Sequence, residues 1–153
     1  MRYNLAFIVK ELKNDNFSLA VIKTVDEFIR NRPLDNICVF TGLCETLDTR
    51  MVPVLHISHA SYFDATVIAL DFESLIFSSV FIQKKDIVYY ATNTPWSDKI
   101  YRYSELNKLF DKNNISQIIC SDDKIAKHYH KFFKQSTSII NGLTYGELYE
   151  KIQ

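Results

Sequence analysis

Glycine is scarce in this chain, and its scarcity excludes two common phosphate-binding motifs. The 153 residues contain three glycines, at positions 42, 142 and 146. G-x-G-x-x-G needs glycines two and then three positions apart, and G-x-x-x-x-G-K-[ST] needs two glycines five positions apart, because the backbone of such a loop must approach phosphate closely. Gly142 and Gly146 are four positions apart, and Gly42 is far from both. The sequence therefore predicts neither a dinucleotide fingerprint nor a Walker loop.

Cysteine, net charge and long apolar runs are also limited. The cysteines at 38, 44 and 120 are odd in number and form no C-x-x-C pair, so structural disulfides are not expected. Eighteen basic residues balance eighteen acidic ones, which argues against a broad surface for nucleic acid or an anionic membrane. No apolar run approaches the ~20 residues of a membrane span, and Lys10 ends the first apolar run early. We expect a cytoplasmic protein.

Apolar residues make up 47% of the chain and predict one well-packed core. Continuous β-branched runs alternate with helical periodicity, which is typical of strands buried on both faces of a parallel sheet. The strongest helical pattern runs from Phe17 to Ile29. The prediction is an α/β fold: a single-domain, Rossmann-like, three-layer sandwich over residues 1–153 with a mostly parallel sheet of about six or seven strands.

The connections around Pro53 to Ile57 are too short for a helical crossover, so an antiparallel strand is considered there. Residues expected to cap helices at their N-termini are Asn16, Ser97, Ser121 and Thr144, the last in the capping box Thr144-x-x-Glu147.

Four segments in the second half of the chain follow a recognisable order: Asp64 to Asp71, Ile87 to Asn93, Ile118 to Asp122 and Ile139 to Tyr145. In this order they resemble the N-terminal, acceptor-type domain of GT-B glycosyltransferases. That family has a strand D-V-I-H-A-H, a helix, a strand V-V-Y-T-x-H-D, then I-I-A-x-S-E, a helix and V-I-x-N-G-V-D. The family's Gly-rich first loop is replaced by Leu12 to Asn16, and its inter-strand histidines by Leu70 and Asn93.

The resemblance implies a glycosyltransferase-like domain that binds a glycan or nucleotide-type ligand, or that forms half of a split glycosyltransferase. The family's second domain, which binds the nucleotide-sugar, has no counterpart in these 153 residues. We therefore expect a protein partner that supplies a donor domain, or a homo-oligomer, and no resident cofactor. The alternative is a non-catalytic structural or interaction module of viral or phage type that keeps only the fold. The missing glycine loop, the missing nucleophile and the many tyrosines favour that alternative.

Polar residues at predicted strand ends are the candidate ligand contacts, because ligands of open α/β sheets bind at the carboxyl ends of strands. They are Thr41, Gly42, His59, Asn93, Thr94, Trp96, Ser121 and Asn141. Trp96 could stack on a sugar or a base, or cover the core beneath a helix start. The pair His56-x-x-His59 is not expected to bind metal, because residues i and i+3 of a strand face opposite sides. No catalytic residue is assigned, since Asp71, Glu73, Asp122 and Asp123 are ordinary at helix starts.

Overall fold

The computed structural model describes residues 4–45, 48, 51–82, 86–95, 102–111 and 115–153. Seven strands form one sheet in the order β3-β2-β1-β4-β5-β6-β7, and each neighbouring pair is parallel. The strands are β1 (Asn4–Leu12), β2 (Asn36–Cys44), β3 (Val54–His56), β4 (Thr66–Ala69), β5 (Ile87–Ala91), β6 (Ile115–Cys120) and β7 (Thr137–Ile139). The helices are α1 (Asn16–Asn31), η1 (Ile57–Tyr62), α2 (Phe72–Phe81), α3 (Tyr103–Phe110), α4 (Asp123–Phe133) and α5 (Tyr145–Ile152).

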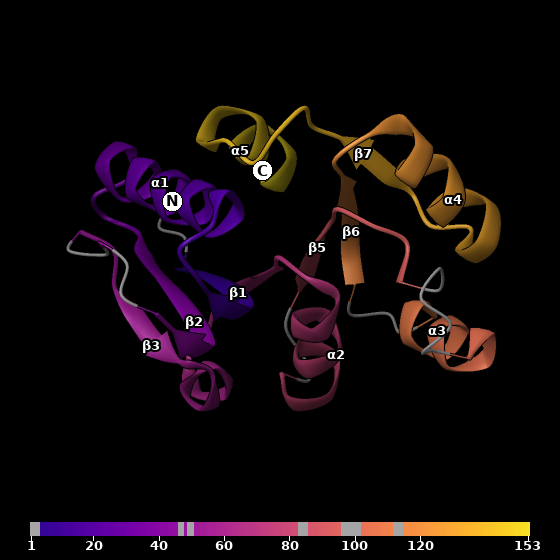
Figure 1. Ribbon diagram of the computed structural model, residues 1–153, viewed down its shortest axis with the longest axis horizontal. Coiled ribbons are helices and arrows are strands. Elements are labelled where there is room, and N and C mark those ends of the chain that lie inside the picture. The colour runs from indigo at the N-terminus through magenta and orange to yellow at the C-terminus, as the bar shows by residue number, and fades with distance from the viewer. Residues whose placement is uncertain (1–3, 46–47, 49–50, 83–85, 96–101, 112–114) are drawn as a thin grey trace.

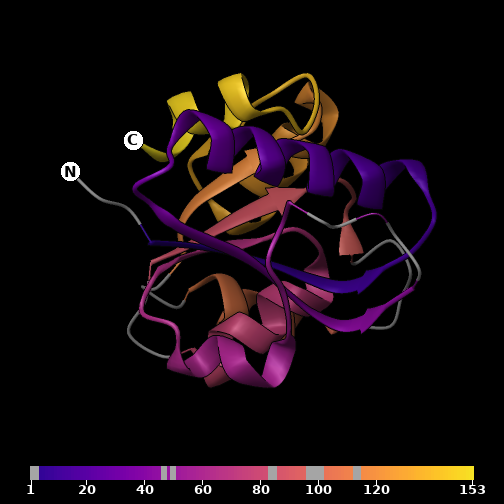
Figure 2. The same cartoon turned by 90° about the vertical axis from the view of Figure 1, so that its left-hand side faces the viewer.

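Helices cover both faces of the sheet, which gives three layers (Figures 1 and 2). One apolar cluster joins alternate strand residues to α1 and α5, and the other joins the intervening residues to η1, α2, α3 and α4. Within β1, for example, Phe7 packs in the first cluster and Ile8 in the second, as the two-residue period of a strand requires. Both faces of the central strands are buried, so their sequences read as unbroken apolar runs. The fold is an α/β Rossmann-like sandwich, as the sequence predicted.

The direction of β3 differs from the antiparallel pairing considered from the sequence. β3 lies parallel to β2, with Val54 opposite Val39. A parallel β3 requires the chain to run back from Cys44, at the end of β2, to the level of Val39, a distance of ~17 Å along the strand. The connection between Cys44 and Val54 has nine residues and can span up to ~30 Å. An extended connection is therefore long enough for a parallel return.

Two helix caps differ by one residue from the expected positions. Asp15, not Asn16, is the N-cap of α1, and Asp122, not Ser121, is the N-cap of α4. Asp side chains cap as well as Asn or Ser, so sequence alone did not separate the neighbours. Thr144 is the N-cap of α5, but its side chain makes no cap hydrogen bond. Ser97 lies outside the described residues.

The C-terminal helix packs against α1. The Phe28 ring on α1 meets the Tyr145 ring of α5 edge-on, with centroids 4.7 Å apart. The buried Thr24 hydroxyl donates to the Leu143 carbonyl at 2.7 Å, and Arg32 donates to the Tyr149 hydroxyl at 2.6 Å. These contacts hold the last helix beside the first (Figure 1). Among the described residues no helix is long and apolar enough to cross a membrane.

Candidate functional site

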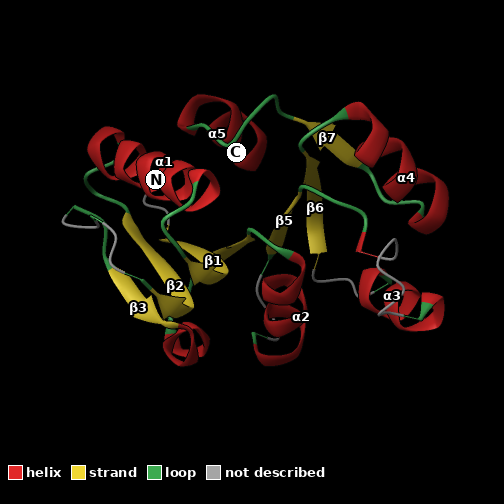
Figure 3. Ribbon diagram, viewed as in Figure 1, coloured by secondary structure: helices red, strands yellow, loops and turns green. Residues whose placement is uncertain are grey.

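The strand order changes direction between β1 and β4, and this change opens a crevice at the carboxyl edge. From β1 the chain moves through α1 to β2, and from β4 it moves through α2 to β5 on the other side of the sheet. Because α1 and α2 lie on opposite faces, the segments that follow β1 and β4 diverge. Ligands of open α/β sheets bind at such a point. Figure 3 shows the two helix starts on either side of the strand ends.

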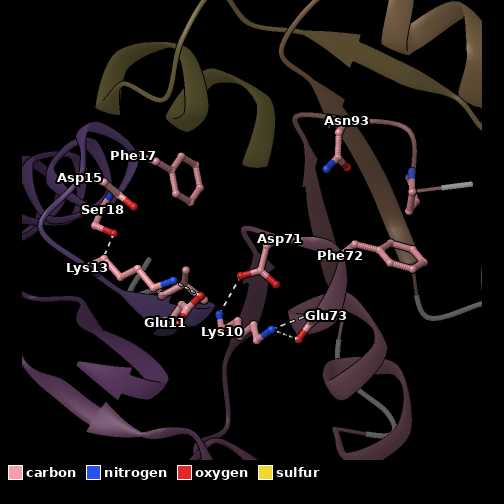
Figure 4. A pocket seen from close by; sticks show the side chains of 12 residues that line it. Lys10, Glu11, Lys13, Asp15, Phe17, Ser18, Asp71, Phe72, Glu73 and Asn93 are labelled. Carbon is pink, nitrogen blue, oxygen red and sulfur yellow. Dashed lines mark hydrogen bonds and ion pairs between the residues drawn. The ribbon is translucent and has the colours of Figure 1, made fainter. Parts of the chain in front are cut away.

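A cavity of about 350 Å³ lies at this point, and we call it the switch-point crevice. Its walls come from the end of β1 and the loop after it, the starts of α1 and α2, and the turn after β5 (Figure 4). The lining residues are Val9, Lys10, Glu11, Lys13, Asp15, Phe17, Ser18, Asp71, Phe72, Glu73, Asn93 and Pro95. A small polar ligand of one or two rings fits this size of cavity.

Asp71 joins the two sides of the crevice. One carboxylate oxygen accepts the Ser74 backbone N–H at 2.8 Å, which caps α2. The other oxygen accepts the Lys10 backbone N–H at 2.7 Å, at the end of β1. A carboxylate that receives two backbone N–H groups at once fixes the strand end and the helix start relative to each other. Asp71 is thus part of the frame of the crevice.

Both lysines of the crevice are paired with glutamates. The Lys10 ammonium lies 2.9 Å from the Glu73 carboxylate, and both side chains are about half exposed. The Lys13 ammonium lies 2.6 Å from the Glu11 carboxylate. Hydrogen bonding to these glutamates raises the pKa of each lysine. Neither lysine therefore presents an uncompensated positive charge to a ligand.

The start of α1 is also occupied by a carboxylate of the chain. Asp15 accepts the Ser18 backbone N–H at 2.7 Å, and this hydrogen bond lowers the pKa of Asp15. The N-terminus of a helix attracts anions because its free N–H groups and dipole point outward. Asp15 and Asp71 already occupy this position at the two helices that open into the crevice.

Of the residues predicted from the sequence, Asn93 lines the crevice, and its amide points inward in Figure 4. Thr94 follows it and is half-buried, while Trp96 lies outside the described residues. Thr41 and Gly42 end β2 beside β1: the buried Thr41 hydroxyl donates to the Leu43 carbonyl at 2.8 Å. A Cβ on Gly42 would lie 3.1 Å from the Lys10 carbonyl oxygen. These two positions border the crevice without lining it.

The other predicted positions lie elsewhere along the carboxyl edge or away from it. Ser121 follows β6, where its N–H donates to the Ala91 carbonyl at 3.0 Å, and Asn141 is exposed after β7. His59 is exposed on η1 and does not line the crevice. Among the described residues no three His, Cys, Asp or Glu side chains converge in a way that could hold a metal ion.

The sequence reasoning missed the contribution of β1. Lys10, Glu11 and Lys13 were seen only as the end of an apolar run, and Asp71 and Glu73 only as ordinary residues of a first helical turn. The available signal was the position of Asp71 directly after a buried strand. Without the strand order, however, nothing in the sequence showed that β1 and β4 are neighbours.

No protein-family model and no curated protein matches this sequence. Among solved structures, the fold is similar to HepE from Anabaena. HepE in complex with UDP-glucose superposes with a TM-score of 0.66 at 14% identity, over 91% of this chain and 43% of HepE. HepE in complex with UDP and glucose gives the same TM-score and identity, over 44% of that chain. The chain thus spans less than half the length of HepE, and at this identity the similarity concerns the fold.

Proposed function

We propose that this chain is a glycosyltransferase-like domain whose switch-point crevice binds the glycan, and that a donor domain outside these 153 residues binds the nucleotide-sugar. The observation that carries the proposal is the cavity of about 350 Å³ at the reversal of strand order, lined mainly by polar side chains. The resemblance of the sequence to GT-B acceptor domains and the structural similarity to a protein solved with UDP-glucose support it.

The charges of the crevice favour an uncharged, hydroxyl-rich ligand over a nucleoside diphosphate such as UDP. Two lysines and four carboxylates line it, which gives a formal charge of −2. Both lysines are paired, and both helix starts carry their own aspartate. A phosphate would meet carboxylates where it needs free N–H groups. Sugar hydroxyls, by contrast, can donate hydrogen bonds to these carboxylates and to the side-chain amide oxygen of Asn93.

One partly exposed aromatic residue, Phe17, adds an apolar surface to the crevice. Phe17 comes from the start of α1 and is labelled in Figure 4, whereas Phe72 of α2 is buried and its ring packs near Tyr89, with centroids 6.4 Å apart. Aromatic rings provide apolar contact area for the C–H faces of a sugar, while neighbouring polar groups orient its hydroxyls.

Binding is tested by titration calorimetry and ligand-observed NMR with neutral oligosaccharides, UDP-glucose and UDP. We expect an oligosaccharide to bind, with an affinity that salt changes little because the ligand is uncharged. Asn93→Ala removes an amide that points into the crevice and should weaken binding about two- to tenfold, the factor for one hydrogen bond. The matched control His59→Ala alters an exposed polar residue outside the crevice and should leave the affinity unchanged. Absence of binding to every oligosaccharide would contradict the proposal.

A charge-removal variant tests the preference for an uncharged ligand. Asp15→Ser together with Asp71→Asn keeps a capping oxygen at both helices and changes the formal charge of the lining from −2 to zero. We expect this variant to gain measurable, salt-sensitive binding of UDP and expect the original chain to show none. Tight UDP binding by the unaltered chain, competed by no oligosaccharide, would instead assign the crevice to the nucleotide.

A further inference from the structure

A buried tyrosine of α4 lies beneath the turn that carries Asn93. The Tyr129 side chain is fully buried, and its ring packs edge-on against the rings of Phe110 and Tyr89, with centroids 5.4 Å and 6.1 Å away. Its hydroxyl lies 3.4 Å from the Asn93 backbone carbonyl oxygen and 3.4 Å from the Tyr89 hydroxyl. A residue of α4 thus reaches past β6 to the turn after β5.

The chemistry of the three groups sets the direction of hydrogen bonding. A carbonyl oxygen can only accept, whereas each phenol can donate one hydrogen and accept others. Both contacts are satisfied when Tyr89 donates to Tyr129 and Tyr129 donates to Asn93. Burial raises the pKa of both phenols, so both keep their hydrogens over the ordinary pH range.

We infer that Tyr129 is a positioning residue: its hydroxyl holds the Asn93 carbonyl and thereby fixes the turn whose side chain enters the switch-point crevice. The Asn93 side chain itself is exposed to the crevice, so its orientation depends on its own backbone. Pro95, also in this turn, is buried and lines the crevice. The role in ligand binding rests on the proposed function, whereas the fixing of the turn does not.

The inference is tested in the ligand-free protein by NMR. Tyr129→Phe deletes the donor and keeps the ring, so the Asn93 carbonyl ¹³C resonance should move in the direction of a lost hydrogen bond. The ¹⁵N relaxation of residues 92–94 should show increased motion. Tyr89→Phe is the matched control, because it removes a buried phenol of the same cluster but keeps the Tyr129 hydroxyl that donates to Asn93. The Asn93 carbonyl resonance should therefore stay close to its original position.

A second variant and a ligand measurement complete the test. The double variant Tyr89→Phe/Tyr129→Phe removes both hydroxyls, so no phenol is left in the core without its partner. It should reproduce the shift of the Asn93 carbonyl resonance seen in Tyr129→Phe, which separates loss of the donor from disturbance of the core. Where an oligosaccharide binds, Tyr129→Phe should weaken it about two- to tenfold, and Tyr89→Phe should not.

An unmoved Asn93 carbonyl resonance and unchanged turn relaxation in Tyr129→Phe would overturn the inference. So would an equal shift in Tyr89→Phe. If no oligosaccharide binds the original chain, the proposed function fails, while the ¹³C and ¹⁵N measurements still decide the role of Tyr129.

Discussion

Replacing Asp71 should destabilise the protein more than the loss of an ordinary helix cap. Asp71→Ala removes the cap of α2, which typically costs about 1 kcal/mol. It also removes the bond from the Lys10 N–H to the second carboxylate oxygen, worth about 1 kcal/mol net at this partly exposed site. The total of about 2 kcal/mol corresponds to a fall in Tm of about 4–8 °C for a chain of this size.

Two variants separate the contributions. Asp122→Ala removes a cap of the same kind, since Asp122 accepts the Ile125 N–H at 2.9 Å at the start of α4, and should cost only about 1 kcal/mol. Asp71→Asn retains one acceptor oxygen and should fall between the original chain and Asp71→Ala. Urea denaturation followed by circular dichroism gives the free energy of unfolding for each. An Asp71→Ala value no larger than that of Asp122→Ala would refute the reasoning that Asp71 joins β1 to α2.

Two further predictions concern pH and the C-terminal helix. Burial raises the pKa of Cys38 to about 11 and of Cys120 to about 12. Thiols of the unfolded chain ionise near pH 9, so the contribution of these two thiols to stability should be constant below that pH and should fall above it. The fall is up to about 1.4 kcal/mol per pH unit for each thiol until its folded pKa is reached. Replacing both cysteines by Val should reduce this alkaline slope in urea titrations. Thr24→Val keeps the shape of the side chain but removes the hydroxyl that donates to the Leu143 carbonyl. It should lower the free energy of unfolding by about 1–2 kcal/mol and speed amide exchange in α5. Unchanged exchange there would contradict the packing described for α5.

Much of the fold could be predicted because burial on both sheet faces leaves a direct record in the sequence. β5 (Ile87–Ala91) lies within Ile87 to Asn93, the segment that matches a strand of the family. Five consecutive apolar residues between polar turns have few other arrangements. The helix over Phe17 to Ile29 followed from its apolar spacing. The exact N-caps, Asp15 and Asp122, did not follow, because adjacent polar residues can cap equally well and packing decides between them.

The candidate site was harder to predict because it depends on strand order. The expectation for Asn93 rested on its place after a buried strand, and that local reasoning also brought in His59, Ser121 and Asn141, which are not in the crevice. Lys10 enters the site only because β1 lies next to β4, a pairing between residues about sixty positions apart. Such a pairing leaves no local pattern, so the half of the site contributed by β1 was not visible in the sequence.

The small number of glycines and the chemistry of the crevice have a common physical basis. A glycine-rich turn exposes N–H groups to a phosphate and leaves the helix start open. Here the segment from β1 to α1 keeps side chains throughout, and Asp15 accepts the N–H of Ser18 that an anion would otherwise bind. Asp71 does the same at α2 while also holding β1. We therefore expect the carboxylates that stabilise the frame also to oppose the binding of phosphate, so that under the proposed function one set of residues determines both stability and ligand charge.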